Sequence, residues 1–423
     1  MKSRRKFLKI AGITGLSTGS ILKSFSAISV NILNAANNNT MLPGENLVSL
    51  IGNYGQWASG LTEKQLPAFS FRNSKWTDIN KWRIAAKKQL AERLAAPEIK
   101  APAYKTIKVY EYDGLQIEEL QWQLPYGRAT SALLLKPVNA KAKLPAILAF
   151  HDHGGNKYFG VRKITKTSDV QHPLMTAHQK EYYEGLAWAN EIAKRGYVVL
   201  VADAFPFASR RVMLQDVPLH LRNGLTDDEP ERSESIHAYN KWAAEHEHIM
   251  AKSLFSAGTT WPGVFFAEDR VALDVLCARA DVDNERVGCC GLSGGGMRTV
   301  FMGGLEERIK CAVCVGFMTT WKDFVLNKSY THTWMTYVPL LPNELDFPEI
   351  LGLRAPLPTL VLNDIDDELY TLPEMKQADH ILQQVFKKTG AAGKYKCSFY
   401  EGPHKFDRSM QKEAFDWFDK WLK

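Results

Sequence analysis

The chain has 423 residues, and its 53 lysines and arginines against 46 acidic residues give a formal net charge of +7. Six of the basic residues precede the first acidic one, Glu45, so the remaining chain carries about +1. Such a balance indicates neither nucleic acid nor an anionic membrane as a partner, and the length suits one large α/β domain behind a leader and a helical preface.

Residues 1–36 have the pattern of an export leader. A basic stretch, Ser3-Arg4-Arg5-Lys6-Phe7-Leu8-Lys9, precedes a weakly apolar one rich in Gly, Ser and Thr. This order resembles a twin-arginine signal peptide. Only thirteen residues separate Lys9 from Lys23, whereas a membrane span needs roughly 20, so the pattern favours export over a permanent anchor.

The resemblance to an export signal implies contact with the export machinery and a periplasmic or secreted protein. Cleavage fits after Ser26 or after Ala36, because both regions offer small residues, and we assign 1–36 to the signal. The alternative is a basic leader on a cytosolic protein.

The next segment, 37–104, is predicted to be a linker followed by a helical preface, with one amphipathic helix from about Trp76 to Leu94. Tyr104 to Pro137 shows three short strand patterns, which are typical of an antiparallel edge before a parallel sheet. Strand and helix patterns then alternate through residues 105–423, and this predicts an α/β fold with a mostly parallel, doubly wound sheet.

The strand pattern Leu144 to Phe150 leads into His151-Asp152-His153-Gly154-Gly155. Small residues in a loop at a strand end let the backbone approach a ligand, so His153 and Gly154 are candidate amide donors to an oxyanion. The rival interpretation is a metal site, because His151 and His153 share one face of an extended chain. No further ligand cluster at a strand end accompanies them, and we predict no metal.

Residues 205–262 form the largest interruption of the strand and helix pattern, and we interpret them as a lid-like substrate-binding insertion. Arg210 or Arg211 could hold a polar or acidic substrate group, against the alternative of a structural ion pair. Trp261 could stack on a sugar ring or simply pack. The run Glu245-His246-Glu247-His248 is interpreted as a solvated helix face, since residues two apart on a helix diverge.

A nucleophile elbow is predicted at Gly291-Leu292-Ser293-Gly294-Gly295, directly after the apolar run 286–290. A serine that leaves a buried strand on a sharp turn needs residues without bulk two before and two after it, and Gly291 and Gly295 meet that need. The amide of Gly294, next to the nucleophile, is the other candidate oxyanion donor.

An acid and a histidine follow in the order that such a serine requires. A buried strand, 358–362, ends in Asn363-Asp364-Ile365-Asp366-Asp367, and a later one, 395–400, ends in Glu401-Gly402-Pro403-His404. We predict His404 as the general base and Asp367 as its acid. Asp364 and Asp366 remain alternatives, as does Asp323 one strand earlier.

These motifs resemble the α/β-hydrolase superfamily, and within it the acetyl xylan esterase and dienelactone hydrolase-like branch, over about residues 105–423. The resemblance rests on the His-x-His-Gly-Gly loop, the elbow and Gly402-Pro403-His404. Members of the branch usually place a proline four residues after the acid, whereas Thr371 stands four after Asp367. Dienelactone hydrolases carry a cysteine nucleophile, so Ser293 favours an oxygen ester.

The expected reaction is two-step acyl transfer through Ser293, His404 and Asp367, with the oxyanion held by the amides of Gly294 and His153. No metal or organic cofactor is required. The resemblance together with export suggests a small-molecule or polysaccharide ester, with acetyl or other small acyl groups removed from carbohydrate. Methyl esters of uronic acids, peptide bonds, acyl transfer to a sugar hydroxyl and binding without catalysis are the alternatives.

Six cysteines in an exported protein raise the question of disulfides. Cys289, Cys290, Cys311, Cys314 and Cys397 lie in apolar strand patterns and Cys277 in a helical one, as small buried apolar residues do. We therefore expect packing thiols, although one bridge between neighbouring elements stays open. Cys311 and Cys314 have no second pair at zinc spacing.

Overall fold

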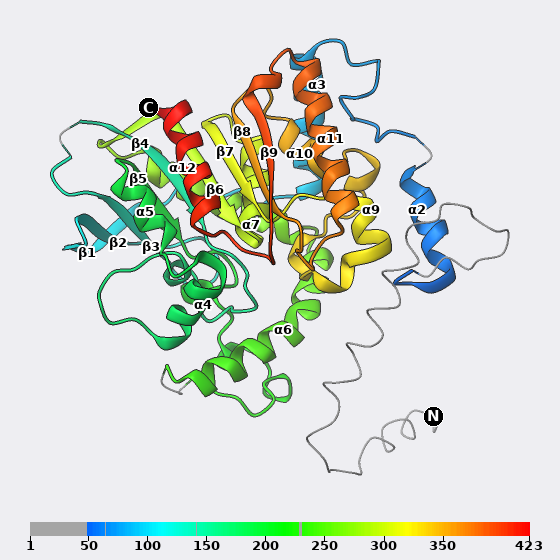
Figure 1. The fold of residues 1–423 in the computed structure, drawn as a ribbon. Helices are drawn as coiled ribbons and strands as arrows, with labels where there is room; N and C mark the ends of the chain where they lie inside the picture. Colours follow the sequence, from blue (N-terminus) through cyan, green and yellow to red (C-terminus); the bar gives the residue numbers. More distant parts are fainter. Residues whose placement is uncertain (1–48, 64, 141, 228–230) are drawn as a thin grey trace, which may run out of the picture. The chain divides into compact units, whose positions relative to one another are not determined.

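The computed structural model describes residues 49–63, 65–140, 142–227 and 231–423 (Figure 1). The predicted signal at 1–36 therefore lies outside the described residues. The predicted preface helix is α3 (Ile79–Leu94), which begins after Asp78, because that side chain accepts hydrogen bonds from the amides of Asn80 and Lys81. Trp82, Ala86, Leu90 and Leu94 are buried at a spacing of four, as expected for one face of a helix.

Within the described residues, nine strands form one sheet in the order β1-β2-β3-β5-β4-β6-β7-β8-β9. Strands β1 to β3 are antiparallel, β3 also pairs antiparallel with β5, and all neighbours from β5 to β9 are parallel. The predicted fold class, with its antiparallel edge, is confirmed. The strands are β1 (Tyr104–Tyr112), β2 (Leu115–Trp122), β3 (Thr130–Pro137), β4 (Leu144–Phe150), β5 (Val198–Ala202), β6 (Val282–Leu292), β7 (Ile309–Val315), β8 (Thr359–Asp364) and β9 (Tyr395–Tyr400).

Helices cover both faces of the sheet because its central strands are apolar on both sides. Ile147 of β4 packs in one cluster with Trp188 of α5 (Trp188–Lys194) and Phe418 of α12 (Arg408–Leu422), and these two helices lie in front of the sheet in Figure 1. Its neighbour Leu148 packs in another cluster with Leu273 of α7 (Trp261–Cys277). Successive side chains of a strand point to opposite faces, so continuous apolar runs make a doubly covered sheet.

The other helices are α2 (Gly55–Glu63), α4 (Pro173–Tyr183), α6 (Ser233–Ser256), α8 (Gly294–Leu305), α9 (Trp321–Asp323), α10 (Phe347–Gly352) and α11 (Leu372–Lys388). None of the helices in the described residues combines the length and the apolar character that a membrane crossing needs.

Three long connections leave the carboxyl ends of parallel strands, after β4, β5 and β7. The connection after β5 contains the predicted insertion and is dominated by α6, which lies below the sheet in Figure 1. The connection after β7, residues 316–358, was not expected from the sequence. Carboxyl ends of parallel strands share one edge of a sheet, and a site between such connections is the usual arrangement.

The prediction of a solvated face at 245–248 is wrong for two of its four residues. Glu245 and His248 are exposed, but His246 is 9% and Glu247 5% exposed. The ring of His246 stacks on Trp242, and Glu247 faces neighbouring segments, because α6 is enclosed along this side.

Candidate active site

Ser293 lies between β6 and α8 with φ 58° and ψ −120°. A positive φ is strained for a residue with a side chain, and such strain is held only where the surrounding structure imposes it. Two glycines make the turn feasible. A Cβ on Gly291 would lie 2.6 Å from the backbone of Gly295, and one on Gly295 would lie 2.5 Å from the carbonyl oxygen of Phe150. This is the local geometry of a nucleophile elbow.

Ser293 and His404 line the same cavity, which has a volume of about 580 Å³. Apolar side chains form much of its wall, among them Phe207, Phe265, Met297, Phe317 and Met335. They come from the connection after β5, from α7 and α8, and from the connection after β7. The cavity therefore offers an apolar surface beside a hydroxyl and an imidazole.

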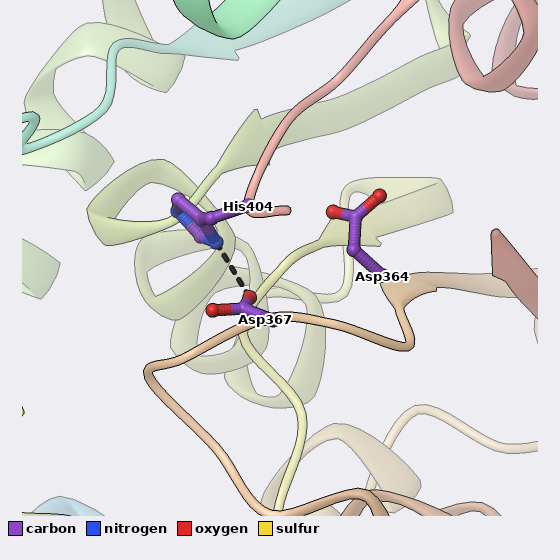
Figure 2. A group of neighbouring side chains, drawn as sticks. All are labelled: Asp364, Asp367 and His404. Carbon is purple, nitrogen blue, oxygen red and sulfur yellow. Dashed lines mark hydrogen bonds and ion pairs between the residues drawn. The ribbon is translucent and has the colours of Figure 1, made fainter. Parts of the chain in front are cut away.

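His404 is held by Asp367, whose Oδ2 lies 2.6 Å from Nδ1 of the imidazole (Figure 2). The other oxygen, Oδ1, accepts a hydrogen bond from the amide of Leu369 at 2.9 Å. Nε2 of His404 is buried and has no hydrogen-bond partner within the described residues. Burial by itself lowers the pKa of His404, but the hydrogen bond to Asp367 and the charge of that carboxylate outweigh burial and raise it.

Asp364 and Asp366 hold the backbone of the His404 loop. Oδ2 of Asp364 accepts from the amide of Lys405 at 3.0 Å, and Oδ2 of Asp366 accepts from the amide of Gly402 at 2.9 Å. Figure 2 shows Asp364 without a bond to His404. Burial raises the pKa of Asp364 to about 7. The sequence left three aspartates as alternatives for the acid, and among them Asp367 is the one that hydrogen-bonds the imidazole.

One group of potential metal ligands is found in the described residues, Asp364, Asp367 and His404, whose donor atoms lie within 4.8 Å of one another. Two of its members already bind each other through Nδ1 and Oδ2. The other acid considered, Asp323, is buried and accepts hydrogen bonds from Thr319, Asn327 and Thr371. It is engaged at the start of α11 rather than at His404.

Gly316, at the end of β7, is a site residue that sequence reasoning missed. It has φ +57°, and a Cβ there would lie 2.9 Å from Cε1 of His404. The sequence signal that could have identified Gly316 is its position directly after β7, the strand that pairs with β6. It leaves room for the imidazole above the strand end.

The two predicted oxyanion donors lie next to each other. A Cβ on Gly294 would stand 3.1 Å from the backbone nitrogen of His153. Within the described part of the chain, neither the amide of Gly294 nor that of His153 takes part in a hydrogen bond. Gly154 follows with φ +48°, and a Cβ there would overlap Oδ2 of Asp152 at 2.4 Å, so the loop requires glycine.

Lys163 orients this loop, and it too was missed. Its Nζ donates to the carbonyl oxygens of Asp152 and His153 at 2.8 Å each, while Nδ1 of His151 donates to that of Asp152 at 3.0 Å. The carbonyl of Asp152 and the amide of His153 belong to one planar trans peptide and point in opposite directions. Fixing the carbonyl therefore directs the amide away from Lys163. Burial lowers the pKa of Lys163 to about 8.

The side chains of His151 and His153 are engaged separately, so the structure does not support the alternative of a metal between them. Nδ1 of His153 accepts from the amide of Gly155 at 3.1 Å, which leaves the proton on Nε2, 3.1 Å from Oε1 of Glu247. Nε2 of His151 lies 3.3 Å from the amide of Ala204.

Glu247 of α6 connects three segments around the cavity. Besides His153, its Oε1 lies 2.5 Å from Nζ of Lys157, and its Oε2 accepts from Oγ1 of Thr333 at 2.6 Å and from the amide of Trp334 at 3.1 Å. Burial raises the pKa of Glu247, but the bond from His153 and the charge of Lys157 outweigh it and lower the pKa to about 2. Glu247 thus connects α6 to the loop that contains His153 and to the segment after β7.

Arg210, Arg211 and Trp261, predicted as possible substrate-binding residues, do not line the cavity that holds Ser293 and His404. Arg210 is 4% exposed and bonds to Glu268 at 2.7 Å, so its charge is used inside the fold. Arg211 lies over the ring of Tyr158 beside a different hollow. Trp261 is 1% exposed and packs on Phe205. Arginine and tryptophan are often recruited for such structural contacts.

Comparisons with known proteins bear on the fold. No protein-family model matches the chain. A Bacillus subtilis (strain 168) protein named as a hydrolase, YtaP, is 26% identical over 344 residues, which cover 80% of this chain and all of that protein.

Solved structures are similar over most of the chain. A Bacteroides fragilis protein named as an acetyl xylan esterase has a TM-score of 0.60 at 17% identity and covers 85% of this chain and 84% of its own. A glucuronoyl esterase from Solibacter usitatus has a TM-score of 0.56 at 15% identity, covering 85% and 98%. A methylesterase has a TM-score of 0.53 at 17% identity, covering 91% and 74%. With the strand order and the turn at Ser293, this likeness establishes that the sheet and the helices around it have an α/β-hydrolase fold.

Proposed function

We propose that this chain is a serine hydrolase of ester bonds that removes acetyl or other small acyl groups from carbohydrate. The observation that carries the proposal is the arrangement of one cavity. Ser293 enters it from a strained turn, and His404, bonded to Asp367 through Nδ1, keeps a buried Nε2 without a partner among the described residues. A nucleophile, a base and an orienting acid are the parts that acyl transfer needs.

In the proposed mechanism, Nε2 of His404 takes the proton from Oγ of Ser293 while that oxygen attacks the ester carbonyl carbon. Asp367 fixes the imidazole and stabilises its charged form. The negative oxygen of the tetrahedral intermediate binds the amides of Gly294 and His153, which Lys163 and the elbow hold in place. His404 then gives its proton to the leaving alcohol, and an acyl-enzyme forms.

Water completes the cycle by the same route. His404 removes a proton from the water as it attacks the acyl-enzyme, and then returns that proton to Oγ of Ser293 as the acid leaves. Each step uses side chains and amides of this chain.

The cavity wall and the similar proteins bear on the substrate class. The apolar cavity wall suits a small acyl group, and the similar proteins named above include an acetyl xylan esterase. A second candidate is hydrolysis of uronic acid esters, because a methylesterase and a glucuronoyl esterase share the fold at similar TM-scores. Peptidase and acyltransferase activities on the same scaffold are alternatives without a specific observation in their favour.

We also propose that the protein is exported by the twin-arginine route and acts in the periplasm or outside the cell. The support is the Arg4-Arg5 motif together with the short, weakly apolar stretch that follows it. Changing both arginines to lysine should leave the protein in the cytoplasm, whereas the unchanged chain should appear outside it. Equal export of the two would contradict the proposal.

The test of the activity is the release of acetate and of methanol by the purified protein from acetylated and methyl-esterified polysaccharides. Ser293→Ala is the matched blank and should lose about 10⁶-fold in turnover, as removal of a triad nucleophile does. Acetate release that disappears in the variant supports the first candidate, and methanol release supports the second. Activity retained by Ser293→Ala would refute both.

A further inference from the structure

Among the described residues that line the cavity, the charged side chains without a partner are acidic. Among the described residues that line it, Arg298 is the only lysine or arginine. Asp269 binds this guanidinium at two points, Nε at 3.0 Å and Nη2 at 2.6 Å, and both side chains are buried. The positive charge is therefore balanced inside the protein. Lys157 is buried beside the lining residue Glu247, which balances its charge in the same way.

The lining histidines other than His404 add no positive charge at neutral pH. Burial lowers the pKa of His332 to about 4. Burial, together with nearby positive charges, also lowers the pKa of His151 and that of His153. All three are neutral when the enzyme would work, so they offer no counter-charge to a carboxylate on a substrate.

Two lining carboxylates, Glu181 and Glu368, are exposed and make no ion pair within the described residues. Each is the chain neighbour of a residue near or bonded to His404. Glu181 precedes Tyr182, whose ring is 6.4 Å from the imidazole, centroid to centroid, and Glu368 follows Asp367. His404 gives its proton to the leaving alcohol, so the alcohol half of a substrate must pass this side of the cavity.

From this arrangement we infer that Glu181 and Glu368 make the enzyme select esters whose alcohol half carries no negative charge. The inference rests on the proposed function and narrows it. Neutral sugars are accepted, whereas an alcohol with a carboxylate close to the scissile bond is repelled. Lys328 donates from Nζ to the main-chain carbonyl of Glu368, but it does not line the cavity, and Arg298, which does, is balanced by Asp269. This selection favours acetyl esters on neutral glycans over esters embedded in uronate-rich polymers.

The test uses two aryl acetates that differ only in charge on the alcohol, 4-acetoxybenzamide and 4-acetoxybenzoate. We expect the double variant Glu181→Gln/Glu368→Gln to raise kcat/KM for the anionic ester roughly three- to tenfold relative to the neutral one, as expected for two exposed charges about 8–10 Å away in water. Comparing variant with wild type on each ester cancels the intrinsic reactivity of the two substrates. Glu111 is an exposed carboxylate on β1, and Glu111→Gln is the matched control. It should leave the ratio of kcat/KM for the anionic ester to that for the neutral ester unchanged.

Salt gives a second readout. Raising the ionic strength from about 0.01 M to 1 M shortens the screening length from about 30 Å to 3 Å, so wild-type discrimination should shrink toward that of the double variant. An unchanged ratio in the double variant, or a wild type that prefers the anionic ester, would overturn the inference. The latter result would assign the unpaired Nη1 of Arg298 to anion binding. Failure to hydrolyse either ester would instead contradict the proposed function.

Discussion

At the scale of single residues, three aspartates within four positions hold the His404 loop at three different atoms. Asp367 bonds the imidazole, whereas Asp364 and Asp366 bond the amides of Lys405 and Gly402. We predict that Asp367→Ala lowers kcat by about 10³–10⁴-fold, because His404 loses the group that fixes its tautomer. Asp366→Ala, which removes one exposed backbone contact, should cost less than tenfold. Steady-state kinetics on a short acyl ester would check both, and a milder effect at Asp367 would refute the assignment.

The pH profile depends on Asp364. His404 must be neutral to accept the proton of Ser293, so kcat/KM should fall as the pH drops through its raised pKa. The charge of Asp364 contributes to that rise, and because its own pKa is about 7, this charge develops over the same range. Asp364→Asn removes it. We therefore predict that the acid limb of the profile moves to lower pH.

The comparison is a kcat/KM profile between about pH 5 and 9 for the wild type, Asp364→Asn and Asp366→Asn. The last variant should keep the wild-type limb, because the carboxylate of Asp366 bonds the exposed amide of Gly402 and not the imidazole. A limb that stays in place or moves upward in Asp364→Asn would show that this carboxyl does not act on His404.

At the scale of elements, Glu247 links α6 to the loop that contains His153. Glu247 bonds His153, the proposed donor of an oxyanion amide, and it also bonds Thr333 after β7. We predict that Glu247→Gln lowers kcat at least tenfold with a smaller change in KM. The reason is that the bond between His153 and α6 is weakened, so the amide of His153 is held less firmly toward the oxyanion. Stability should fall by about 3 kcal/mol, since Lys157 is left buried without its counter-charge.

Glu245→Gln is the matched control, because Glu245 is exposed two residues earlier on the same helix. Kinetics and denaturant unfolding of the two variants should separate clearly. Equal behaviour would mean that α6 packs over the cavity without acting on the loop that contains His153.

The elements themselves could be predicted from the sequence because their signals are local. Apolar runs such as 144–150 specify strands covered on both faces. The elbow is predicted from Gly291 and Gly295, which lie two residues before and two after Ser293. Glu247 and Lys163 could not be found in this way. Glu247 meets His153 across 94 positions, and nothing near it in the sequence distinguishes it from the exposed Glu245. The same limit applies to Arg210, whose partner Glu268 lies 58 positions away.

At the scale of the whole molecule, the proposed export raises the question of whether the protein depends on disulfides. All six cysteines are free. Cys289, Cys290, Cys311 and Cys314 are buried in the two central strands β6 and β7, and burial raises the pKa of Cys289 to about 12. A thiol that cannot ionise neither oxidises nor exchanges readily, so these side chains act as small apolar residues even in an oxidising compartment.

We predict that a reducing agent leaves the Tm of the protein unchanged within about 1 °C, because no crosslink constrains the unfolded chain. A thiol reagent should react slowly with the half-buried Cys277 and Cys397 in the native protein, and with the other four only after unfolding. Thermal melts with and without reductant, followed by thiol counting in native and denaturing buffer, would check this. A Tm that drops on reduction would show that the mature protein carries a bridge, and that packing of the sheet alone does not account for its stability.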